Sequence, residues 1–440
     1  MLISGWGRYP LEECVLQQPR SETDLLALLG QGSLIARGNG RGYGDCAQNA
    51  ACTVDMRRFN RMLAFDPDTG CLAAEAGVLL SDVIASFLPR GWFPTVTPGT
   101  KYVTVGGMVA ADVHGKNHHR DGSFGAFVDW LDVLGADGQV RRCSRDQNAE
   151  LFAWTIGGMG LTGVILRAAF RLRRVESAWI RQTILPSPNL ETAMRIFEDH
   201  AAASYSVAWI DCLAGGAALG RSIIALGEHA TAAELPAPSR THPYDVPAKK
   251  KLRIPFDMPA VLMNSWTVRA FNAAYYHREA GKRGERLVDW DSYFYPLDAL
   301  VDWNRIYGRP GFLQFQCALP LAGAHRGLTA LLRVIAESGQ GSFLAVLKRL
   351  GAGQGGALSF PLEGYTLALD FPVSSRSLAL MERLDEIVLA RGGRFYLAKD
   401  SRLNARTLRA SDDRVAQFVD MRRSLAATSF RSSQSERLQL

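Results

Sequence analysis

Glycine occupies every second position in a short segment near the N-terminus that follows the apolar residues Leu34 and Ile35. The segment, residues 36–45, reads ARGNGRGYGD and contains two arginines. Glycine has no Cβ atom, so backbone N–H groups in such a segment can approach a phosphate within hydrogen-bonding distance. The sequence therefore predicts a binding site for a cofactor that contains a diphosphate.

A Rossmann dinucleotide site does not explain this segment. Position 43 is tyrosine where the GxGxxG pattern needs glycine, and polar residues 46–49 follow where that motif needs a helix. A literal GxGxxG occurs at Gly158, Gly160 and Gly163, but it precedes the strand-like residues 164–170 instead of following a strand. Neither segment predicts a Rossmann fold.

Two further glycine clusters, at residues 98–115 and 157–163, favour FAD as the cofactor. FAD is long and needs several separate contacts, which three glycine-rich loops can supply. Together the clusters resemble the FAD-binding half of the vanillyl-alcohol-oxidase flavoproteins, the PCMH type. The resemblance assigns these residues to FAD: Arg37, Gly38, Asn39, Gly40, Arg41, Gly42, Tyr43, Gly44, Asp45, Gly99, Thr100, Thr104, Val105, Gly106, Gly107, Ala111, Asp112, Val113, His114, Ile165 and Tyr396.

Three motifs resemble a single family of that superfamily. HGKNHH at 114–119, GFLQFQ at 311–316 and YLAKDSR at 396–402 are similar to the decaprenylphosphoryl-β-D-ribose 2-oxidase family. The resemblance runs from residue 5 almost to the C-terminus and implies a two-domain α+β fold. Residues 1–175 and 394–440 are expected to form the FAD-binding domain. Residues 176–393 are expected to form an α+β substrate (cap) domain with an antiparallel sheet and a mobile loop near 230–285.

Lys399 is the predicted base. Oxidation of a secondary alcohol removes a hydride from carbon and a proton from oxygen, so a base near the hydroxyl assists. Lys399 follows the apolar residues 395–398, and burial lowers the pKa of a lysine toward neutrality. The resemblance gives it the place of the family's active-site lysine and puts His114 at the flavin edge. We expect Tyr43 to lie against the flavin or to form a hydrogen bond near the substrate.

Two amides are predicted to contact the substrate. Gln314 and Gln316 alternate on a predicted strand and therefore face the same side, where they could bind sugar hydroxyls. Without the resemblance, polar groups at the edge of the core explain them equally well. The resemblance adds the following substrate residues: Lys116, Trp209, Lys348 and Thr366.

Three departures from the family pattern bear on the substrate. Thr366 stands where the family often has asparagine, Ala368 where it has cysteine, and Phe294 where it has tyrosine. None of these positions is an obvious proton carrier. The identity of the sugar is therefore less certain from the sequence than the reaction.

A metal site is the alternative explanation for the histidines at 114, 118 and 119. Gly115 and the lack of a nearby cysteine or carboxylate ligand disfavour zinc. We therefore expect no metal, and expect His118 and His119 to bond loop carbonyls.

Bulk composition narrows the class of protein. A chain of 440 residues with 47% hydrophobic and 21% charged residues is typical of a two-domain globular protein. No apolar run of eighteen residues occurs, the N-terminus does not resemble a signal peptide, and the seven cysteines form no CxxC pair. A cytoplasmic location, or one peripheral to the cell membrane, is expected.

The net charge of +7 favours anionic ligands, but dispersed basic residues without a recognition motif argue against nucleic acid.

Local patterns predict short strands interleaved with helices. The predicted strands are residues 33–36, 53–55, 63–65, 72–76, 128–134, 139–141, 205–210, 222–226, 313–319, 342–347 and 365–371. The predicted helices are residues 25–29, 82–88, 190–203, 328–338 and 377–390.

Taken with the resemblance, the residues favour FAD-dependent oxidation of a sugar's secondary hydroxyl to a ketone. The expected substrate is a polyprenyl-phosphoryl ribose-like pentose, oxidised at C2 in the first half of an epimerisation that a short-chain NAD(P)-dependent reductase completes. A soluble sugar-alcohol or aldonolactone oxidase, resembling D-arabinono-1,4-lactone oxidase, is one alternative. A flavin-binding interaction protein without turnover is another, although Lys399 and His114 argue against it.

A basic cluster at Lys249, Lys250 and Lys251 lies beside the apolar residues 254–256 and 258–263. A solvated loop and a peripheral contact with anionic lipid both fit this pattern. A polyprenyl-phosphate substrate has to be reached at a bilayer, which favours the lipid contact.

The first glycine segment also predicts how FAD is held. In relatives with covalent FAD a histidine of this segment bonds the flavin, and here that place is Tyr43. We expect purified protein to be yellow and to release intact FAD when precipitated with acid or heat, as measured by absorbance of the supernatant. Flavin that stays with the denatured polypeptide would contradict non-covalent binding.

Overall fold

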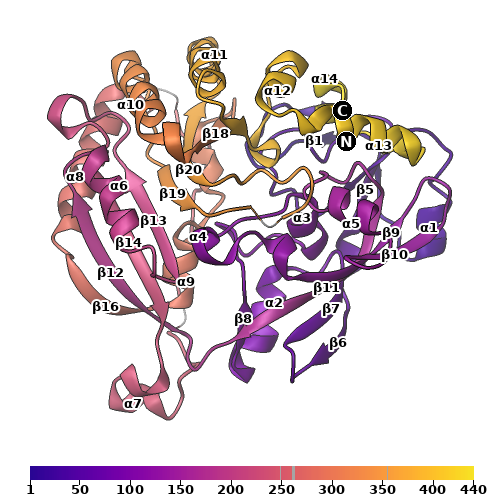
Figure 1. Ribbon diagram of the computed structural model, residues 1–440, viewed down its shortest axis with the longest axis horizontal. Coiled ribbons are helices and arrows are strands. Elements are labelled where there is room, and N and C mark those ends of the chain that lie inside the picture. Colours follow the sequence, from indigo (N-terminus) through magenta and orange to yellow (C-terminus); the bar gives the residue numbers. More distant parts are fainter. Residues whose placement is uncertain (248, 260–262, 354) are drawn as a thin grey trace.

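The computed structural model describes residues 1–247, 249–259, 263–353 and 355–440, which form two parts lying side by side (Figure 1). One part contains both chain ends and the segments coloured indigo, purple and yellow. The other contains most of the magenta and orange segments. This arrangement confirms the expected α+β fold, because helices and antiparallel sheets are mixed in both parts.

The first part contains two sheets that end at the glycine-rich loops. In the smaller sheet the strands β3, β5 and β4 are parallel. The larger sheet has the order β10-β9-β11-β7-β6, with β8 also paired to β11. Their bounds are β3 Leu16–Gln17, β4 Ile35–Arg37, β5 Thr53–Asp55, β6 Met62–Asp66, β7 Cys71–Glu75, β8 Trp92–Pro94, β9 Val128–Leu134, β10 Val140–Ser144 and β11 Val164–Arg174.

Short helices cover these sheets and the C-terminal helices return to them. Their bounds are α1 Glu22–Leu26, α2 Leu80–Phe87, α3 Val105–Ala110, α4 His118–Asp121, α5 Ala149–Thr155, α12 Ala405–Ser411, α13 Arg414–Ser424 and α14 Ser433–Leu438. Arg437 of α14 forms ion pairs with the buried carboxylates of Asp45 and Asp400, at 2.7 and 3.0 Å. The last helix therefore fixes both the first glycine segment and the loop that carries Lys399.

The second part is built on one eight-stranded sheet in which every pair is antiparallel, as expected for the cap. Its order is β16-β12-β14-β13-β19-β20-β18-β21. The bounds are β12 Trp179–Ser187, β13 Tyr205–Ile210, β14 Ser222–His229, β16 Gly284–Asp289, β18 Phe312–Pro320, β19 Ala345–Leu350, β20 Gly364–Pro372 and β21 Arg394–Phe395. Because β21 pairs with β18, the expected domain boundary at residue 394 falls inside this sheet, and the boundaries stay a prediction.

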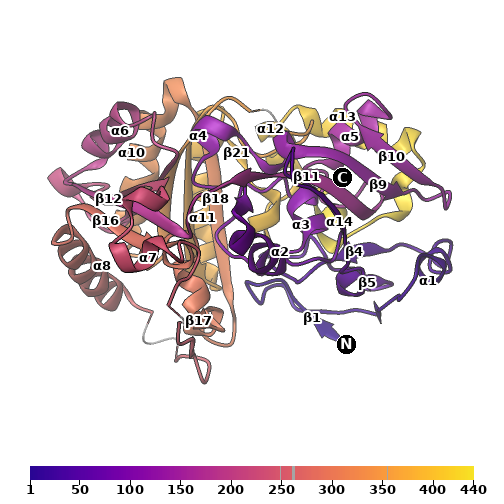
Figure 2. The same ribbon diagram turned by 90° about the horizontal axis from the view of Figure 1, so that it is seen from below.

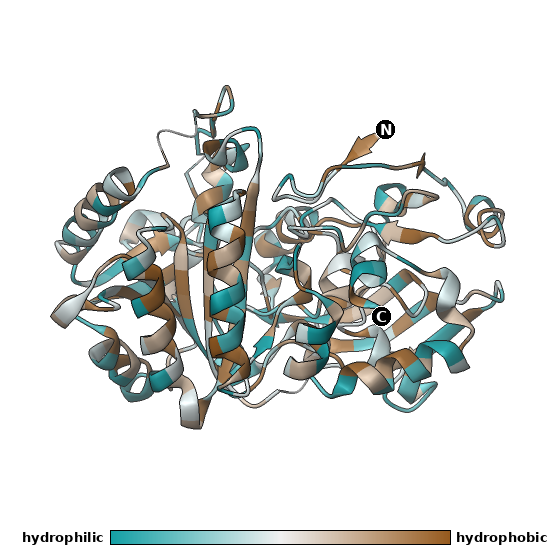
Figure 3. Cartoon of the chain, turned by 90° about the horizontal axis from the view of Figure 1, so that it is seen from above, coloured by the Kyte–Doolittle hydropathy of each residue, from teal (hydrophilic) through white to brown (hydrophobic). Residues whose placement is uncertain are grey.

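The two faces of this sheet differ. One face packs against α6 Leu190–Asp199, α10 Leu321–Ser338 and α11 Ser375–Leu389, and its side chains, such as Ile224 and Leu347, are fully buried. Figure 3 shows brown strands behind helices whose outer sides carry teal, hydrophilic residues. The alternate residues point to the other face, which looks toward the glycine-rich loops, as the cavity described below shows.

The remaining elements lie outside the three larger sheets; among them β1 pairs with β2 and β15 pairs with β17. They are β1 Leu2–Ile3, β2 Glu12–Glu13, α7 Ala237–Arg240, β15 Leu252–Arg253, α8 Ser265–Ala280, α9 Trp290–Phe294 and β17 Leu300–Val301. Figure 2 shows α8 at the outer side of the second part, and it packs against β12 and β14. Within the described residues no helix is both long enough and apolar enough to cross a bilayer.

Candidate active site

A cavity of about 610 Å³ is lined by both parts of the molecule. It collects most of the residues that the sequence predicts for FAD: Arg37, Gly38, Asn39, Gly40, Arg41, Gly42, Tyr43, Gly99, Thr100, Thr104, Gly106, Gly107, Ala111, Val113, His114, Ile165 and Tyr396. The cap sheet contributes the predicted substrate residues Trp209, Gln314, Gln316 and Lys348. The predicted substrate residue Lys116 also lines the cavity and comes from the loop after His114. Lys399 lies in the same cavity.

Glycine is required where the cofactor loops touch one another. A Cβ atom on Gly38 would lie 2.2 Å from the Oγ1 of Thr104, and one on Gly106 would lie 2.8 Å from the Cβ of Ala76. Thr104 in turn caps α3 by accepting a hydrogen bond from the N–H of Gly107. The loops after β4 and before α3 thus pack back to back along the cavity wall.

The polar atoms of this wall fit a bound flavin nucleotide. The Nε of Arg41 and the Nδ1 of His114 are buried and have no hydrogen-bond partner among the residues that the structure describes. The Arg41 guanidinium stacks 4.0 Å from the ring centre of Trp6. Glycine backbone and unpaired donors along one elongated cavity are what a diphosphate cofactor requires.

Four predicted FAD residues do not line the cavity. Asp45 is paired with Arg437, and Asp112 accepts hydrogen bonds from the N–H of Gly125 and the hydroxyl of Ser123 at 2.7 and 2.6 Å. The other two, Gly44 and Val105, pack within the protein. In this structure the four residues shape the loops, and their contact with FAD stays a prediction.

Lys399 stands over the ring of Tyr43, with Nζ 3.3 Å from the ring centre. Burial lowers the pKa of Lys399 to about 7, although the Asp370 carboxylate opposes the shift. Burial also raises the pKa of Asp370 to about 7, and Gln314 donates a hydrogen bond to its Oδ1 at 2.5 Å. A lysine in these surroundings can be neutral near pH 7 and accept a proton.

His114 is held as a neutral ring. Burial, with Lys348 nearby, lowers the pKa of His114 well below its usual value. Its Nε2 lies 3.2 Å from the amide nitrogen of Gln316, so Nε2 accepts and the proton resides on Nδ1. The same amide donates to the hydroxyl of Thr366 at 3.3 Å, which places Thr366 behind Gln316 and outside the cavity lining.

Two more lysines, both half-buried, lie beside this group in the cavity. Burial lowers the pKa of Lys116 to about 7 and the pKa of Lys348 to about 8. The Lys116 ammonium donates to the backbone carbonyl of Tyr293 and lies 4.2 Å from the centre of that ring. Neither lysine forms an ion pair with a carboxylate in the part of the chain that the structure describes. The site therefore has unmatched capacity for an anion.

Trp209 lies farther along the sheet. Its Nε1 donates to the carbonyl of Phe343 at 3.0 Å, and its ring is 4.6 Å from that of Tyr275 on α8. The sequence did not predict the neighbours of Trp209 as site residues: Gln182, Ile184, Val207, Ile223, Ala225, Arg286 and Val288. The available signals were the alternation in residues 205–209 and the apolar run at residues 223–226.

The histidine cluster does not gather ligands. His119 Nε2 lies 2.8 Å from the carbonyl oxygen of Ala203, as expected for a loop histidine, whereas neither ring nitrogen of His118 has a partner among the described residues. Over those same residues no three His, Cys, Asp or Glu side chains come together as a metal site would need.

Two of the three clustered lysines are already engaged. Lys249 pairs with Asp289 at 2.5 Å, and Lys251 donates to the hydroxyl of Tyr102 at 2.7 Å. Only Lys250 of the cluster has no such contact in the described part of the chain. The mobility expected for residues 230–285 stays a prediction, and α8 occupies part of that range.

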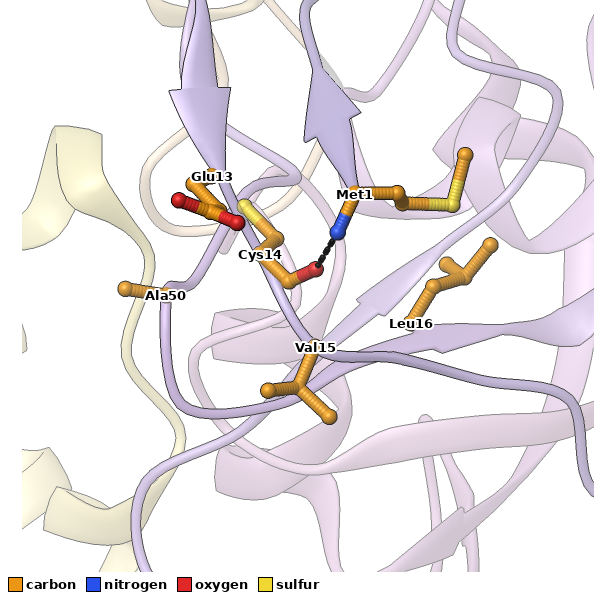
Figure 4. A pocket seen from close by; sticks show the side chains of 6 residues that line it. All are labelled: Met1, Glu13, Cys14, Val15, Leu16 and Ala50. Carbon is orange, nitrogen blue, oxygen red and sulfur yellow. Dashed lines mark hydrogen bonds between the residues drawn. The ribbon is translucent and has the colours of Figure 1, made fainter.

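A second hollow, near the N-terminus, offers little chemistry (Figure 4). Its walls are formed by Met1, Glu13, Cys14, Val15, Leu16 and Ala50. The terminal amino group donates to the carbonyl of Cys14 at 2.7 Å, and burial raises the pKa of the Cys14 thiol.

Comparison with known proteins defines the class. A family model described as "FAD binding domain" matches residues 15–144, which contain two of the three glycine clusters. With the cavity geometry, this makes the chain an FAD-dependent oxidoreductase with a PCMH-type fold.

The relatives narrow the class to one family. The chain is 36% identical over 449 residues to decaprenylphosphoryl-beta-D-ribose oxidase of Mycolicibacterium smegmatis, covering 100% of this chain and 97% of that protein. It is also 35% identical over 365 residues to an uncharacterized protein of Streptomyces coelicolor, covering 80% and 97%. L-gulonolactone oxidase of Mus musculus is 30% identical over 150 residues, 33% of each chain. The protein belongs to the decaprenylphosphoryl-β-D-ribose oxidase family.

The Lys399 environment predicts a pH-dependent rate. Only neutral lysine accepts a proton, so anaerobic flavin reduction by substrate should accelerate as pH rises through about 7. Lys399→Met should keep the absorbance of bound FAD but reduce the flavin about 10²- to 10⁴-fold more slowly in stopped flow. A rate within a few fold of wild type would remove Lys399 from proton transfer.

Asp370→Asn sharpens this test. Amide oxygen can still accept from Gln314, but the negative charge that raises the Lys399 pKa is gone. The rising limb of the pH profile should therefore move to lower pH. If the rising limb does not move, the pKa that it reports belongs to a group other than Lys399.

Proposed function

We propose that this protein oxidises the C2 hydroxyl of a polyprenyl-phosphoryl ribose-like pentose to the ketone. The observation that carries the proposal is the order of groups in one cavity. Lys399, His114 and Gln316 stand together, and the unpaired cations Lys116 and Lys348 lie next to them. The group around Lys399 suits the alcohol of a sugar, and the two lysines suit the phosphate attached to that sugar. The relative that matches the full length of this chain is named for such a substrate.

The chain's own residues have separate tasks in this reaction. FAD bound along the glycine loops supplies the acceptor for the hydride that leaves the carbinol carbon. Neutral Lys399 takes the hydroxyl proton, so charge and electrons balance when the ketone forms. Gln316 and the Nδ1–H of His114 can hold the sugar oxygens, and Lys116 and Lys348 can bind the phosphate.

Lys116 and Lys348 favour this substrate over the alternatives. A neutral polyol or aldonolactone would cover these two half-buried ammonium groups without supplying a counter-ion, which is unfavourable in a low-dielectric site. A flavin-binding protein without turnover has no need of Lys399 in a state that can accept a proton. The ketone product would then be a substrate for a short-chain NAD(P)-dependent reductase that adds hydride to the opposite face.

Anaerobic flavin reduction tests the proposal. Polyprenyl-phosphoryl ribose should bleach the flavin at far lower concentration than free polyols or aldonolactones. Lys348→Gln should raise the half-saturating concentration more than it lowers the limiting rate, and Arg423→Gln, a surface change on α13 at a 70% exposed side chain, should do neither. Equal bleaching by free polyols would favour the soluble-substrate alternative, and no bleaching by any compound would favour the non-catalytic one.

We also propose a peripheral membrane contact at residues 250–256. Leu252 and Phe256 are 66% and 57% exposed beside Lys250, a combination suited to an anionic lipid surface. Co-sedimentation with anionic vesicles should fall with salt and should weaken in a Lys250→Gln, Phe256→Ser double variant. Equal sedimentation of both proteins would leave this segment a solvated surface loop.

A further inference from the structure

The cavity continues beyond these two half-buried lysines over the face of the cap sheet. Six apolar side chains from four adjacent strands line this extension, here called the apolar strip: Ile184, Val207, Trp209, Ile223, Ala225 and Val288. Val207 lies opposite Ala225, and Ala225 lies opposite Ile184, so the strip crosses the sheet in register. With strands about 4.8 Å apart, it extends roughly 14 Å from β13 to β16.

The strip borders the cavity: Ile184 and Ile223 are buried, and its other four members are half-buried. The alternate residues of the same strands, such as Ala208 and Ile224, are fully buried against helices on the opposite face. Val207, Trp209 and Ala225 are only half-buried and border the cavity. Apolar surface that faces a cavity gains free energy when an apolar ligand covers it.

Polar groups mark both ends of the strip. Lys348 lies on β19 at the inner end. At the outer end Arg286 donates from Nε and Nη2 to the side-chain oxygen of Gln182, at 3.0 and 2.9 Å. Tyr275 of α8 contacts the ring of Trp209 and borders the same space. The cavity is therefore polar at the reacting end, cationic next, and apolar beyond.

We infer that the apolar strip holds the first isoprene units of the substrate's lipid tail. The inference rests on the proposed function, because the order of the three zones matches sugar, phosphate and hydrocarbon in one molecule. An uncharged branched hydrocarbon fits the strip, and the phosphate at Lys116 and Lys348 fixes its direction. A longer tail would leave the cavity past Arg286 and α8.

Binding of tail analogues tests this without turnover. Isothermal titration of the FAD-loaded protein with dimethylallyl, geranyl and farnesyl phosphate should show affinity rising about tenfold or more with each added unit. The heat-capacity change should become more negative along the same series, since apolar burial produces that sign. Equal affinity for the three compounds would overturn the inference.

Variants locate the effect. Ala225→Phe fills the middle of the strip and should remove most of the rise in affinity with tail length. Val288→Gln places a polar side chain on the edge strand and should make that rise smaller. Ala217→Phe, an exposed residue in the turn before β14, is the matched control and should keep the gain. A gain preserved in both strip variants would also overturn the inference.

Binding of tail analogues and flavin reduction together separate a failure of the strip inference from a failure of the proposed reaction. Tail-dependent binding without flavin reduction by polyprenyl-phosphoryl ribose would keep the strip as a lipid site and reject the proposed reaction. Flavin reduction by that compound with no tail dependence in binding would keep the reaction and reject the strip.

Discussion

The partial burial of three lysines around one cavity is the constraint on which this site depends. Lys116, Lys348 and Lys399 have their pKa values lowered to between about 7 and 8 because burial penalises the ammonium form. A buried cation is tolerated when it loses its proton or meets an anion. Lys399, over the Tyr43 ring, suits the first outcome, and the other two lysines suit the second.

The cap sheet makes this arrangement possible because one of its faces packs against helices and the other lines the cavity. One face is sealed by α6, α10 and α11, which supply the hydrophobic stability. The other face is therefore free to carry polar and half-buried groups toward the FAD loops. Because side chains alternate along a strand, Gln314 and Gln316 reach the cavity while Phe315 is buried between them.

Several elements could be predicted because their signals are local. The strands at 53–55 and 205–210 have the bounds that their patterns predict, and Ser21 caps α1 with a complete capping box. The strands β12 and β16 and the helix α8 were not predicted. The polar edge strand β16 reads Gly-Glu-Arg-Leu-Val-Asp, without clear alternation, and α8 has apolar residues on more than one side. Their structure depends on partners distant in sequence, so the apolar strip they complete was also missed.

The sequence by itself determined the chemistry that the chain can hold: glycine loops for a diphosphate cofactor, a lysine after an apolar run, and two amides spaced to share a strand face. These are properties of residue type and short spacing, and family resemblance connects them. Only the tertiary structure decided which charges are buried together, because Lys116, Lys348 and Lys399 come from segments more than two hundred residues apart at the extremes. It also decided that Asp45 and Asp112 support loops, since their partners Arg437 and Gly125 lie 392 and 13 residues away along the chain. Desolvation and pairing depend on the packed surroundings, which no local pattern specifies.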